Sequence, residues 1–165
     1  MKIMGLLLGV LLALAALLLV AGQLGLFAGK PPQDLGVRDG RLQPPSLTPN
    51  SVSSQAGRYA DHPQRSEADI APLPYTGDAK AALGRLATLL ESTPGCALVT
   101  REPAYLYAQC HTRWLQFTDD VEFSLDEVGG VIHVRSASRL GSKDFGVNRA
   151  RMEALRARFD QARRT

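Results

Sequence analysis

Arginine, serine, aspartate and asparagine side chains are concentrated in one stretch near the carboxyl terminus, "VRSASRLGSKDFGVNRARME". Guanidinium groups bind phosphate and carboxylate through paired hydrogen bonds, and free N–H groups at the start of a helix favour anions. Such a stretch could form an active site, an anion pocket, or a cluster of ion pairs that holds the fold together. The candidate binding residues are Arg135, Ser136, Ser138, Arg139, Asp144, Gly146, Asn148 and Arg149.

The strand pattern in this stretch separates the basic residues from the serines. Arg135, Ala137 and Arg139 alternate on one face of the expected strand, and the two serines lie on the other. Gly141 permits a sharp turn, after which the arginine side chains could approach a helix amino terminus. The alternative is a lattice of internal ion pairs, because acidic and basic residues occur in matching numbers. Its members would be Arg135, Arg139, Arg149, Asp119, Asp120 and Asp144.

We expect the lattice to be the main role of this stretch and anion binding to be confined to its exposed edge. Catalysis would need carboxylates and an imidazole to converge, and the candidates are Asp119, Asp120, Glu122, Asp126 and His133. The paired aspartates have the composition of a tight hairpin turn, and His133 is one alternating residue of a strand. No serine has a nucleophile-elbow setting. The sequence therefore predicts no catalytic residue, metal site or cofactor, and the positions of His111 and His133 relative to carboxylates or a serine test this.

The first residues of the chain determine where these side chains are displayed. Residues 3–28, "IMGLLLGVLLALAALLLVAGQLGLFA", contain no charged residue and are long enough to cross a bilayer as a helix. An uncleaved anchor is favoured over a cleaved secretory signal, whose apolar core is shorter, and over a buried soluble helix. The expected membrane contact is therefore through residues 3–28.

The side of the membrane is a separate question. Lys2 precedes the apolar run, whereas Lys30, Arg38 and Arg41 follow it, so the distribution of positive charge does not favour export. Long following domains are nevertheless translocated largely regardless of charge. With a short amino-terminal tail and a signal-like start, we expect a bacterial inner-membrane protein whose soluble part faces the periplasm.

The net charge of +3 arises largely from the carboxy-terminal segment "NRARMEALRARFDQARRT". Basic residues interleaved with apolar ones at helical spacing are typical of a solvated helix face. The chain also lacks a phosphate-cradling glycine loop and the strand motif of RNA-binding domains. We therefore expect no nucleic-acid partner.

The remaining chain divides into two parts. Residues 30–64, hereafter the strap, are rich in proline, glycine and serine and are expected to be an extended tether on the surface, outside the core. Next, "YTGDAKAALGRLATLLESTPG" predicts an amphipathic helix capped by Thr76 or Asp78. The segments "CALVT", "AYLYAQCHTRWLQF", "VEFSLDE" and "GVIHVRSAS" predict consecutive antiparallel strands, with breaks at 102–103, 119–120 and 129–130.

A second helix is expected over about 144–163, with Asp144 as its cap and Met152, Leu155 and Phe159 on its apolar stripe. The fold class is therefore α+β: a membrane helix, then a small antiparallel sheet of about four strands, with two helices packed on one face. The expected divisions are 1–29 for the anchor or signal-like segment, 30–64 for the strap and 65–165 for the α+β domain.

Several segments resemble one family. "LGVRDGRL", "PNSVSSQA", "IAPLPYTGD", "FTDDVEFSLDE" and "VIHVRSASRLGSKDFGVNRARME" together are similar to the bacterial and plastid domain-of-unknown-function family numbered 1499. The resemblance spans residue 35 to about residue 159. It implies that the protein is membrane-anchored or exported, as members often are, and it implies no reaction. Many relatives carry a cysteine pair in the strap where this chain has Pro45 and Ser51. The strap of this chain therefore cannot form the link between those two positions.

The two cysteines of this chain lie elsewhere, at Cys96 and Cys110. If the strands fold back around Pro103, the two thiols lie opposite each other on one face and a cross-strand disulfide is possible. A register slip of one residue would put them on opposite faces, as two buried thiols behaving as small hydrophobic side chains.

Two functions from different classes are consistent with this organisation. The first is a membrane-anchored extracytoplasmic binding or scaffolding module without catalysis, whose partner is an envelope protein or an anionic lipid. The alternative is an envelope enzyme acting on a lipid or cell-wall substrate.

Overall fold

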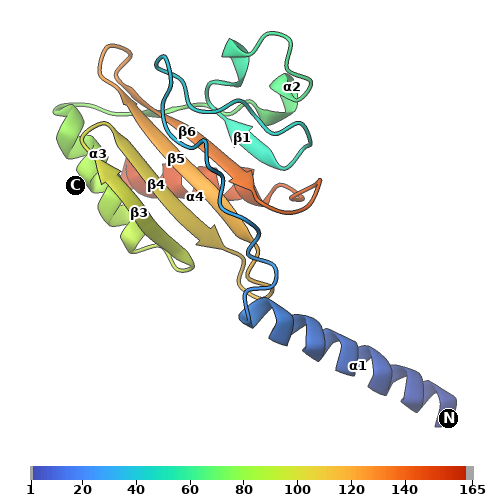
Figure 1. The fold of residues 1–165 in the computed structure, drawn as a ribbon. Coiled ribbons are helices and arrows are strands. Elements are labelled where there is room, and N and C mark those ends of the chain that lie inside the picture. The colour runs from blue at the N-terminus through green and yellow to red at the C-terminus, as the bar shows by residue number, and fades with distance from the viewer. Residues whose placement is uncertain (1, 163–165) are drawn as a thin grey trace.

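The apolar amino-terminal segment forms one long helix in the computed structural model of the chain, which describes residues 2–162. This helix, α1 (Lys2–Gln23), projects away from the rest of the protein (Figure 1). It ends because Gly25 adopts a left-handed conformation, with φ of 76°, and donates its N–H to Gly22. Leu26 donates to Ala21 in the same turn, which is the Schellman pattern of helix termination. In residues 2–162, α1 is the one helix long and apolar enough to cross a membrane.

An antiparallel sheet forms the centre of the fold. Its long strands are β3 (Cys96–Glu102), β4 (Tyr105–His111), β5 (Thr118–Asp126) and β6 (Val131–Ser138), which pair in sequence order. Two short strands, β1 (Ser51–Ser53) and β2 (Leu73–Pro74), both pair with the outer edge of β6. The described part of the chain therefore has six strands, two more than expected, because strands of two and three residues are too short to show an alternating pattern.

Two helices cover one face of this sheet, hereafter the helix face (Figure 1). Both α3 (Ala79–Glu91) and α4 (Val147–Ala162) contribute apolar side chains to it, as expected, and the predicted cap Asp78 accepts a hydrogen bond from the Ala81 N–H at 2.7 Å. The expected last helical residue, 163, lies outside the described residues. Large buried members of this core include Leu73, Leu86, Leu90, Leu106, Phe123, Ile132, Met152, Leu155 and Phe159.

The strap crosses the opposite face of the sheet, hereafter the strap face (Figure 1). Its Leu42 is buried against Tyr105 and Tyr107 of β4. Later in the strap, Val52 of β1 belongs to the main core, and the short helix η1 (Ala56–Arg58) buries Ala56. The expectation that the strap lies outside the core is therefore wrong for these residues. A second short helix, α2 (Arg65–Ala68), follows the strap.

The boundary between β4 and β5 also differs from the expectation. Asp119 and Asp120 lie inside β5, paired with Cys110 and Gln109 of β4, and the connecting loop is residues 112–117. The prediction of a hairpin turn at these aspartates is wrong. Aspartates are common in turns because their side chains bond to the local backbone, but here each carboxylate is buried against an arginine distant in the sequence.

Candidate functional site

The sheet separates the predicted site residues into two groups. Arg135 and Arg139 lie on the strap face, as their alternation predicted, while Ser136 and Ser138 lie on the helix face with Asn148. The structure therefore does not bring the two arginines to the amino terminus of α4. The expected combination of strand guanidinium groups with helix N–H groups does not form, because strand residues one position apart point to opposite faces.

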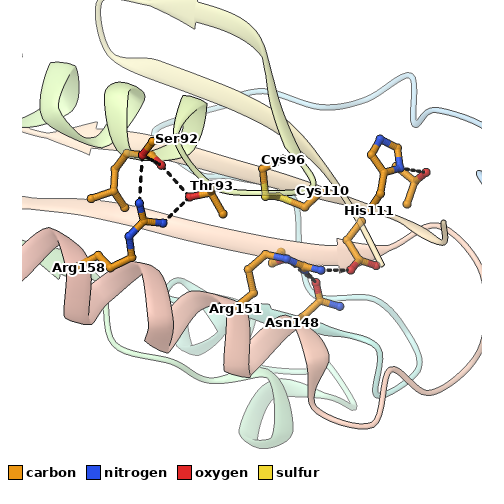
Figure 2. Close-up of a disulfide and its surroundings, with 12 residues drawn as sticks. Ser92, Thr93, Cys96, Cys110, His111, Asn148, Arg151 and Arg158 are labelled. Carbon is orange, nitrogen blue, oxygen red and sulfur yellow. Dashed lines mark hydrogen bonds and ion pairs between the residues drawn. A yellow bond between two sulfur atoms is a disulfide. The ribbon is translucent and has the colours of Figure 1, made fainter. Parts of the chain in front are cut away.

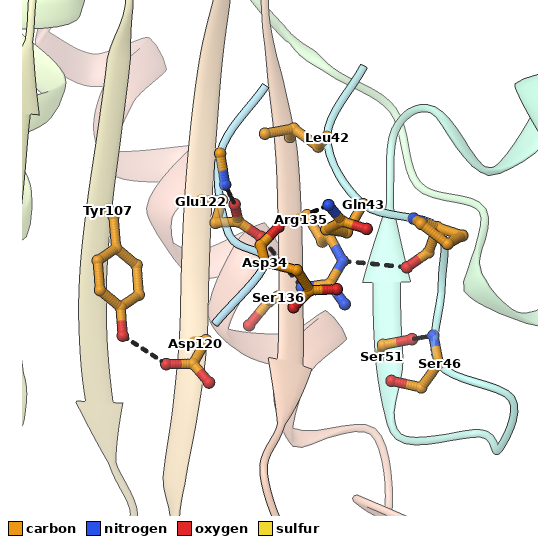
Figure 3. Close-up of polar contacts among 12 residues, drawn as sticks. Asp34, Leu42, Gln43, Ser46, Ser51, Tyr107, Asp120, Glu122, Arg135 and Ser136 are labelled. Carbon is orange, nitrogen blue, oxygen red and sulfur yellow. Dashed lines mark hydrogen bonds and ion pairs between the residues drawn. The ribbon is translucent and has the colours of Figure 1, made fainter. Parts of the chain in front are cut away.

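Glu122 and Arg135 form the first buried ion pair of the strap face, with Arg135 Nη1 3.1 Å from Glu122 Oε2 (Figure 3). The other carboxylate oxygen accepts hydrogen bonds from the Gly36 N–H at 2.8 Å and the Tyr105 hydroxyl at 2.9 Å. Arg135 also donates Nε to the Pro44 carbonyl at 3.2 Å. Burial first, and then the Glu122 charge, raises the pKa of Tyr105, so its hydroxyl remains a donor to the carboxylate.

Asp120 and Arg139 form the second ion pair, whose geometry is bidentate. Arg139 donates Nε to Oδ2 at 2.9 Å and Nη2 to Oδ1 at 2.7 Å. The Tyr107 hydroxyl donates to Asp120 Oδ1 at 2.6 Å and accepts from Arg139 Nη2 at 3.1 Å (Figure 3). The hydrogen bond to Asp120 raises the pKa of Arg139, which stays charged. Each charge in these two pairs therefore has an oppositely charged partner and further hydrogen bonds, as buried ions require.

The helix face carries the third ion pair, with Arg151 Nη2 of α4 2.6 Å from Asp119 Oδ2 of β5 (Figure 2). Arg151 also donates to the Asn148 side-chain carbonyl at 3.0 Å. Asn148 is fully buried; its carbonyl accepts from the Ser136 hydroxyl and its amide donates to Ser138 Oγ at 2.9 Å. The first turn of α4 is thereby fixed to β6 by side-chain hydrogen bonds rather than by apolar packing.

The lattice of ion pairs therefore exists, but with partners that differ in part from those expected. Arg139 pairs with Asp120, both of them expected members of the lattice, whereas Arg135 pairs with Glu122, which was not among the expected members. Arg149 donates Nη2 to two backbone carbonyls, of Glu67 at 2.8 Å and Asp69 at 2.9 Å. Sequence reasoning considered Glu122 only as a catalytic candidate, and it missed Tyr105, Tyr107, Asn50 and Arg151. The alternation of "AYLY" and "DDVE" could have identified the roles of Glu122, Tyr105 and Tyr107, because it places both tyrosines on one face opposite alternate acids.

Asp144 acts as the cap of α4, as expected. Its two carboxylate oxygens accept hydrogen bonds from the N–H groups of Gly146, at 3.0 Å, and Asn148, at 2.9 Å. Asn50, which immediately precedes β1, donates its amide to the Gly141 carbonyl at 2.6 Å and accepts from the Asn148 amide at 3.0 Å through its backbone carbonyl. The corner between β6 and α4 is therefore a rigid structure in which the strap, the strand and the helix meet.

A cavity of about 500 Å³ opens at this corner. Phe145 lies at its edge with a side chain that is 94% exposed, in a left-handed backbone conformation. Two cationic side chains, Lys143 and Arg149, and two acidic ones, Glu67 and Asp144, line the cavity. The whole lining consists of Pro49, Ser51, Val52, Gln64, Glu67, Lys143, Asp144, Phe145, Gly146 and Arg149. Three of the predicted binding residues therefore line one cavity, and Arg135 and Arg139 are not among them.

His133 is the residue on which the enzyme alternative depends. Its Nδ1 is 3.2 Å from the Ser54 hydroxyl, and its Nε2 is 3.5 Å from Asp126 Oδ2, a contact that becomes an ion pair only when the imidazole is protonated. Ser54 Oγ, however, also accepts the Val134 N–H at 2.9 Å, which holds the hydroxyl against the backbone of β6. The cavities at the β6–α4 corner and beside the disulfide are lined by other residues. His133 therefore reaches a serine within hydrogen-bond distance, at a place outside these two cavities.

His111 Nδ1 lies 3.1 Å from Thr118 Oγ1. Among residues 2–162, no three histidine, cysteine, aspartate or glutamate side chains are grouped so that they could hold a metal ion.

Cys96 and Cys110 are directly opposite each other in the β3–β4 register and form a disulfide (Figure 2). The strands do fold back around Pro103, and a bulge between Leu98 and Thr100 precedes the turn. A cavity of about 620 Å³ lies beside the disulfide and is lined in part by His111 and Arg113. The bridge joins the outermost strand of the sheet to its neighbour, so it stabilises an edge that has no other strand beside it.

Comparisons with known proteins agree with the resemblance seen in the sequence. No curated protein and no solved structure matches the chain. The model of one family, described as protein of unknown function (DUF1499), matches residues 41–159, which include the second half of the strap, the whole sheet and most of α4. The protein therefore belongs to the DUF1499 family.

Proposed function

We propose that the protein is a membrane-anchored, extracytoplasmic module that binds a partner without catalysing a reaction, and that the cavity at the β6–α4 corner is its binding site. The cavity carries the proposal, because it combines an almost fully exposed aromatic ring with two cationic side chains above a rigid floor. Exposed aromatic and basic residues beside a pocket are typical of protein–ligand contact surfaces.

Two features support the location. The uncharged helix α1 is long enough to cross a bilayer, at about 33 Å for 22 residues at 1.5 Å per residue. The Cys96–Cys110 disulfide is expected to persist only in an oxidising compartment, such as the bacterial periplasm. Together, these features favour an inner-membrane protein whose folded domain faces the periplasm.

The charges around the cavity support an anionic group as part of the ligand. Lys143 is exposed at the edge, and Arg149 is held in place by the two carbonyls that it binds. A carboxylate or phosphate placed between them would gain charge-assisted hydrogen bonds. The Asp144 carboxylate already occupies the helix amino terminus, so the lysine and arginine side chains, rather than the helix N–H groups, would hold the anion.

The ion pairing of the buried carboxylates supports the part of the proposal that excludes catalysis. The three buried carboxylates Asp119, Asp120 and Glu122 are each neutralised by an arginine. Both oxygens of Asp120 and of Glu122 already accept hydrogen bonds from neighbouring protein groups, so neither carboxylate presents a free oxygen to a substrate.

Topology is tested by fusing a reporter that is active only outside the cytoplasm to the carboxyl terminus. We expect activity, because a single amino-terminal anchor with the proposed orientation exports everything that follows it. A well-expressed but inactive fusion would reverse the orientation.

Binding is tested by thermal unfolding with inorganic phosphate and with vesicles that contain anionic phospholipid. Ligand that binds only the folded state raises the melting temperature. We expect a rise for the wild type and for Lys80→Ala, an exposed lysine on α3, and a smaller or absent rise for Lys143→Ala. Equal shifts for all three proteins, or no shift at low salt, would remove the anionic group from the proposal.

A further inference from the structure

The loop between β4 and β5, residues 112–117, lies against the last turn of α1. Gly22 packs so tightly against this loop that a Cβ on it would lie 2.6 Å from the Leu115 carbonyl oxygen. Gln23 donates its amide to the Trp114 carbonyl at 3.5 Å, and the Phe27 and Phe117 rings stack with centroids 5.2 Å apart. The anchor is therefore packed directly on the domain at this end of the sheet.

The loop itself is well fixed. Thr112 accepts the Gln116 N–H through its backbone carbonyl at 3.1 Å and donates its own N–H to the Phe117 carbonyl at 2.9 Å. Gln116, in a left-handed conformation, donates its side-chain amide to the carbonyls of Thr112 and Arg113, both at 3.2 Å. The exposed side chains of this loop are thus held at a constant position relative to the end of α1.

The loop displays one large amphipathic side chain. Trp114 is 64% exposed, and the Arg113 guanidinium lies over its ring, 4.9 Å from the centroid. Leu24 and Leu26, just beyond the end of α1, are also largely exposed. These apolar groups are unpartnered in the described chain and continue the apolar surface of the helix onto the domain.

We propose that Trp114 inserts into the headgroup region of the same bilayer that α1 crosses, as a second membrane contact that sets the orientation of the domain. The proposal rests on the membrane anchoring proposed above. A helix that spans a bilayer ends near its surface, so a loop packed on its last turn lies at the same depth. Tryptophan favours this depth because its ring is apolar and its N–H is polar, and arginine beside it can direct its charge to the headgroups.

With this second contact, the sheet has a fixed orientation relative to the bilayer. The end that carries the β4–β5 loop faces the lipid, and the β5–β6 turn, where Val128 is fully exposed, lies at the opposite end of the two strands (Figure 1). The residues after α1 are then too closely packed to act as a free tether: Gly29 contacts Arg139 and Leu140 at the end of β6.

The test uses the fact that Trp114 is the single tryptophan of the chain. The full chain is reconstituted into phosphatidylcholine vesicles whose acyl chains are brominated close to the glycerol end, because bromine quenches tryptophan fluorescence at short range. We expect a loss of Trp114 emission relative to unbrominated vesicles, together with a shift of the emission to shorter wavelength. The control variant Trp114→Phe/Val128→Trp carries its tryptophan at the opposite end and should show neither change.

The outcomes separate this inference from the proposal on which it rests. Protein that fails to float with the vesicles overturns membrane anchoring itself. Protein that floats while its Trp114 emission is unaffected by bromine overturns the second contact and leaves anchoring in place. Equal quenching in the wild type and the control variant also overturns the inference, because the domain would then lie against the lipid in another orientation.

Discussion

The two faces of the sheet are stabilised in different ways by alternate residues of the same strands. On the helix face, Val121, Phe123 and Val134 are fully buried among apolar side chains. On the strap face, Asp120, Glu122 and Arg135 are buried almost as completely but within hydrogen-bonded ion pairs. The residues named on both faces are buried, so burial alone does not distinguish an apolar core from a polar one.

The two faces should differ in how the stability of the protein responds to substitutions on them. Apolar packing is non-directional, and its loss is graded with the volume removed. A buried ion pair depends on both members, because one charge left alone in the interior is far more costly than the pair is favourable. The ion pairs of the strap face are therefore expected to tolerate replacement of both members better than of one, whereas among the apolar residues of the helix face the costs of separated substitutions add.

The largest effect is expected from Asp120→Ala, which leaves the Arg139 guanidinium buried without its carboxylate. Loss of one member of a buried pair should lower the free energy of unfolding by about 3–5 kcal/mol. The neighbouring Val121→Ala, on the helix face, removes two methyl groups and should cost about 2 kcal/mol. Urea unfolding of the two variants measures both values.

The double variant Asp120→Leu/Arg139→Met sharpens this comparison. It should be more stable than Asp120→Ala, because it leaves no unpaired charge. A double variant less stable than the single one would mean that the strap face needs its charges for more than mutual neutralisation.

A smaller loss is expected at the edge of the sheet. Replacing both cysteines, Cys96→Ala/Cys110→Ala, should lower the free energy of unfolding by about 2–4 kcal/mol, since the bridge closes a loop with a sequence separation of 14. Reduction of the wild type should have a similar effect on the urea midpoint. Thiol labelling of denatured, unreduced protein should detect no free cysteine, and two free thiols per chain would contradict the pairing.

Substitutions at the corner between β6 and α4 should lower the stability less than loss of the ion pair or the disulfide. Asp144→Ala removes a helix cap that accepts two backbone N–H groups and should cost about 1 kcal/mol. Asp144→Asn is the matched control, because it keeps an accepting oxygen and should retain most of the stability. Thermal unfolding of the two variants checks the difference, and an equally large loss in both would indicate that the negative charge matters rather than the hydrogen bonds.

The smallest effect is expected from the pH dependence of stability that His133 causes on the strap face. Burial lowers the pKa of His133 below its ordinary value of about 6.5, although Asp126 opposes the shift. The unfolded chain therefore binds a proton at His133 more readily than the folded one, so stability should fall as the pH drops below about 6.5. His133→Gln should flatten the melting temperature between neutral and mildly acidic pH.

Asp126 provides the control for that prediction. The Gly129 N–H lowers its pKa, with His133 contributing, and the stability gained this way is lost only as the pH falls below the ordinary aspartate range. The two residues thus act in separate pH windows. An unchanged pH profile in His133→Gln between neutral and mildly acidic pH would show that the buried imidazole does not titrate there.

The sequence predicted those elements whose signal is local. The stripe of Met152, Leu155 and Phe159, the caps Asp78 and Asp144, and the alternation of the long strands all depend on residues a few positions apart. The α+β class followed from the same patterns, whereas the family resemblance rested on whole segments that match in sequence. Segments of two or three residues, such as β1 and β2, offer no period to detect.

The ion pairs could be predicted only in part because their members are far apart in the sequence. Asp119 and Arg151 are separated by 32 positions, and Asp120 and Arg139 by 19. Local composition suggested a turn at the aspartates, and only the long-range pairing explains why a strand can bury them there. The two faces of β6 were nevertheless correctly assigned, since alternation alone decides them.

The pairing of the strap with β6 has a consequence for the order in which the chain can fold. Ser51 to Ser53 pair with Ala137 to Arg135, and Asn50 bonds to Gly141, which is 91 positions later. A segment made early must therefore wait for almost the whole chain before it finds its partner, and such long-range closure slows folding. During synthesis, Glu122 and Arg135 would meet each other in a hairpin well before the strap closes over them. The charged face would then be assembled first and covered last.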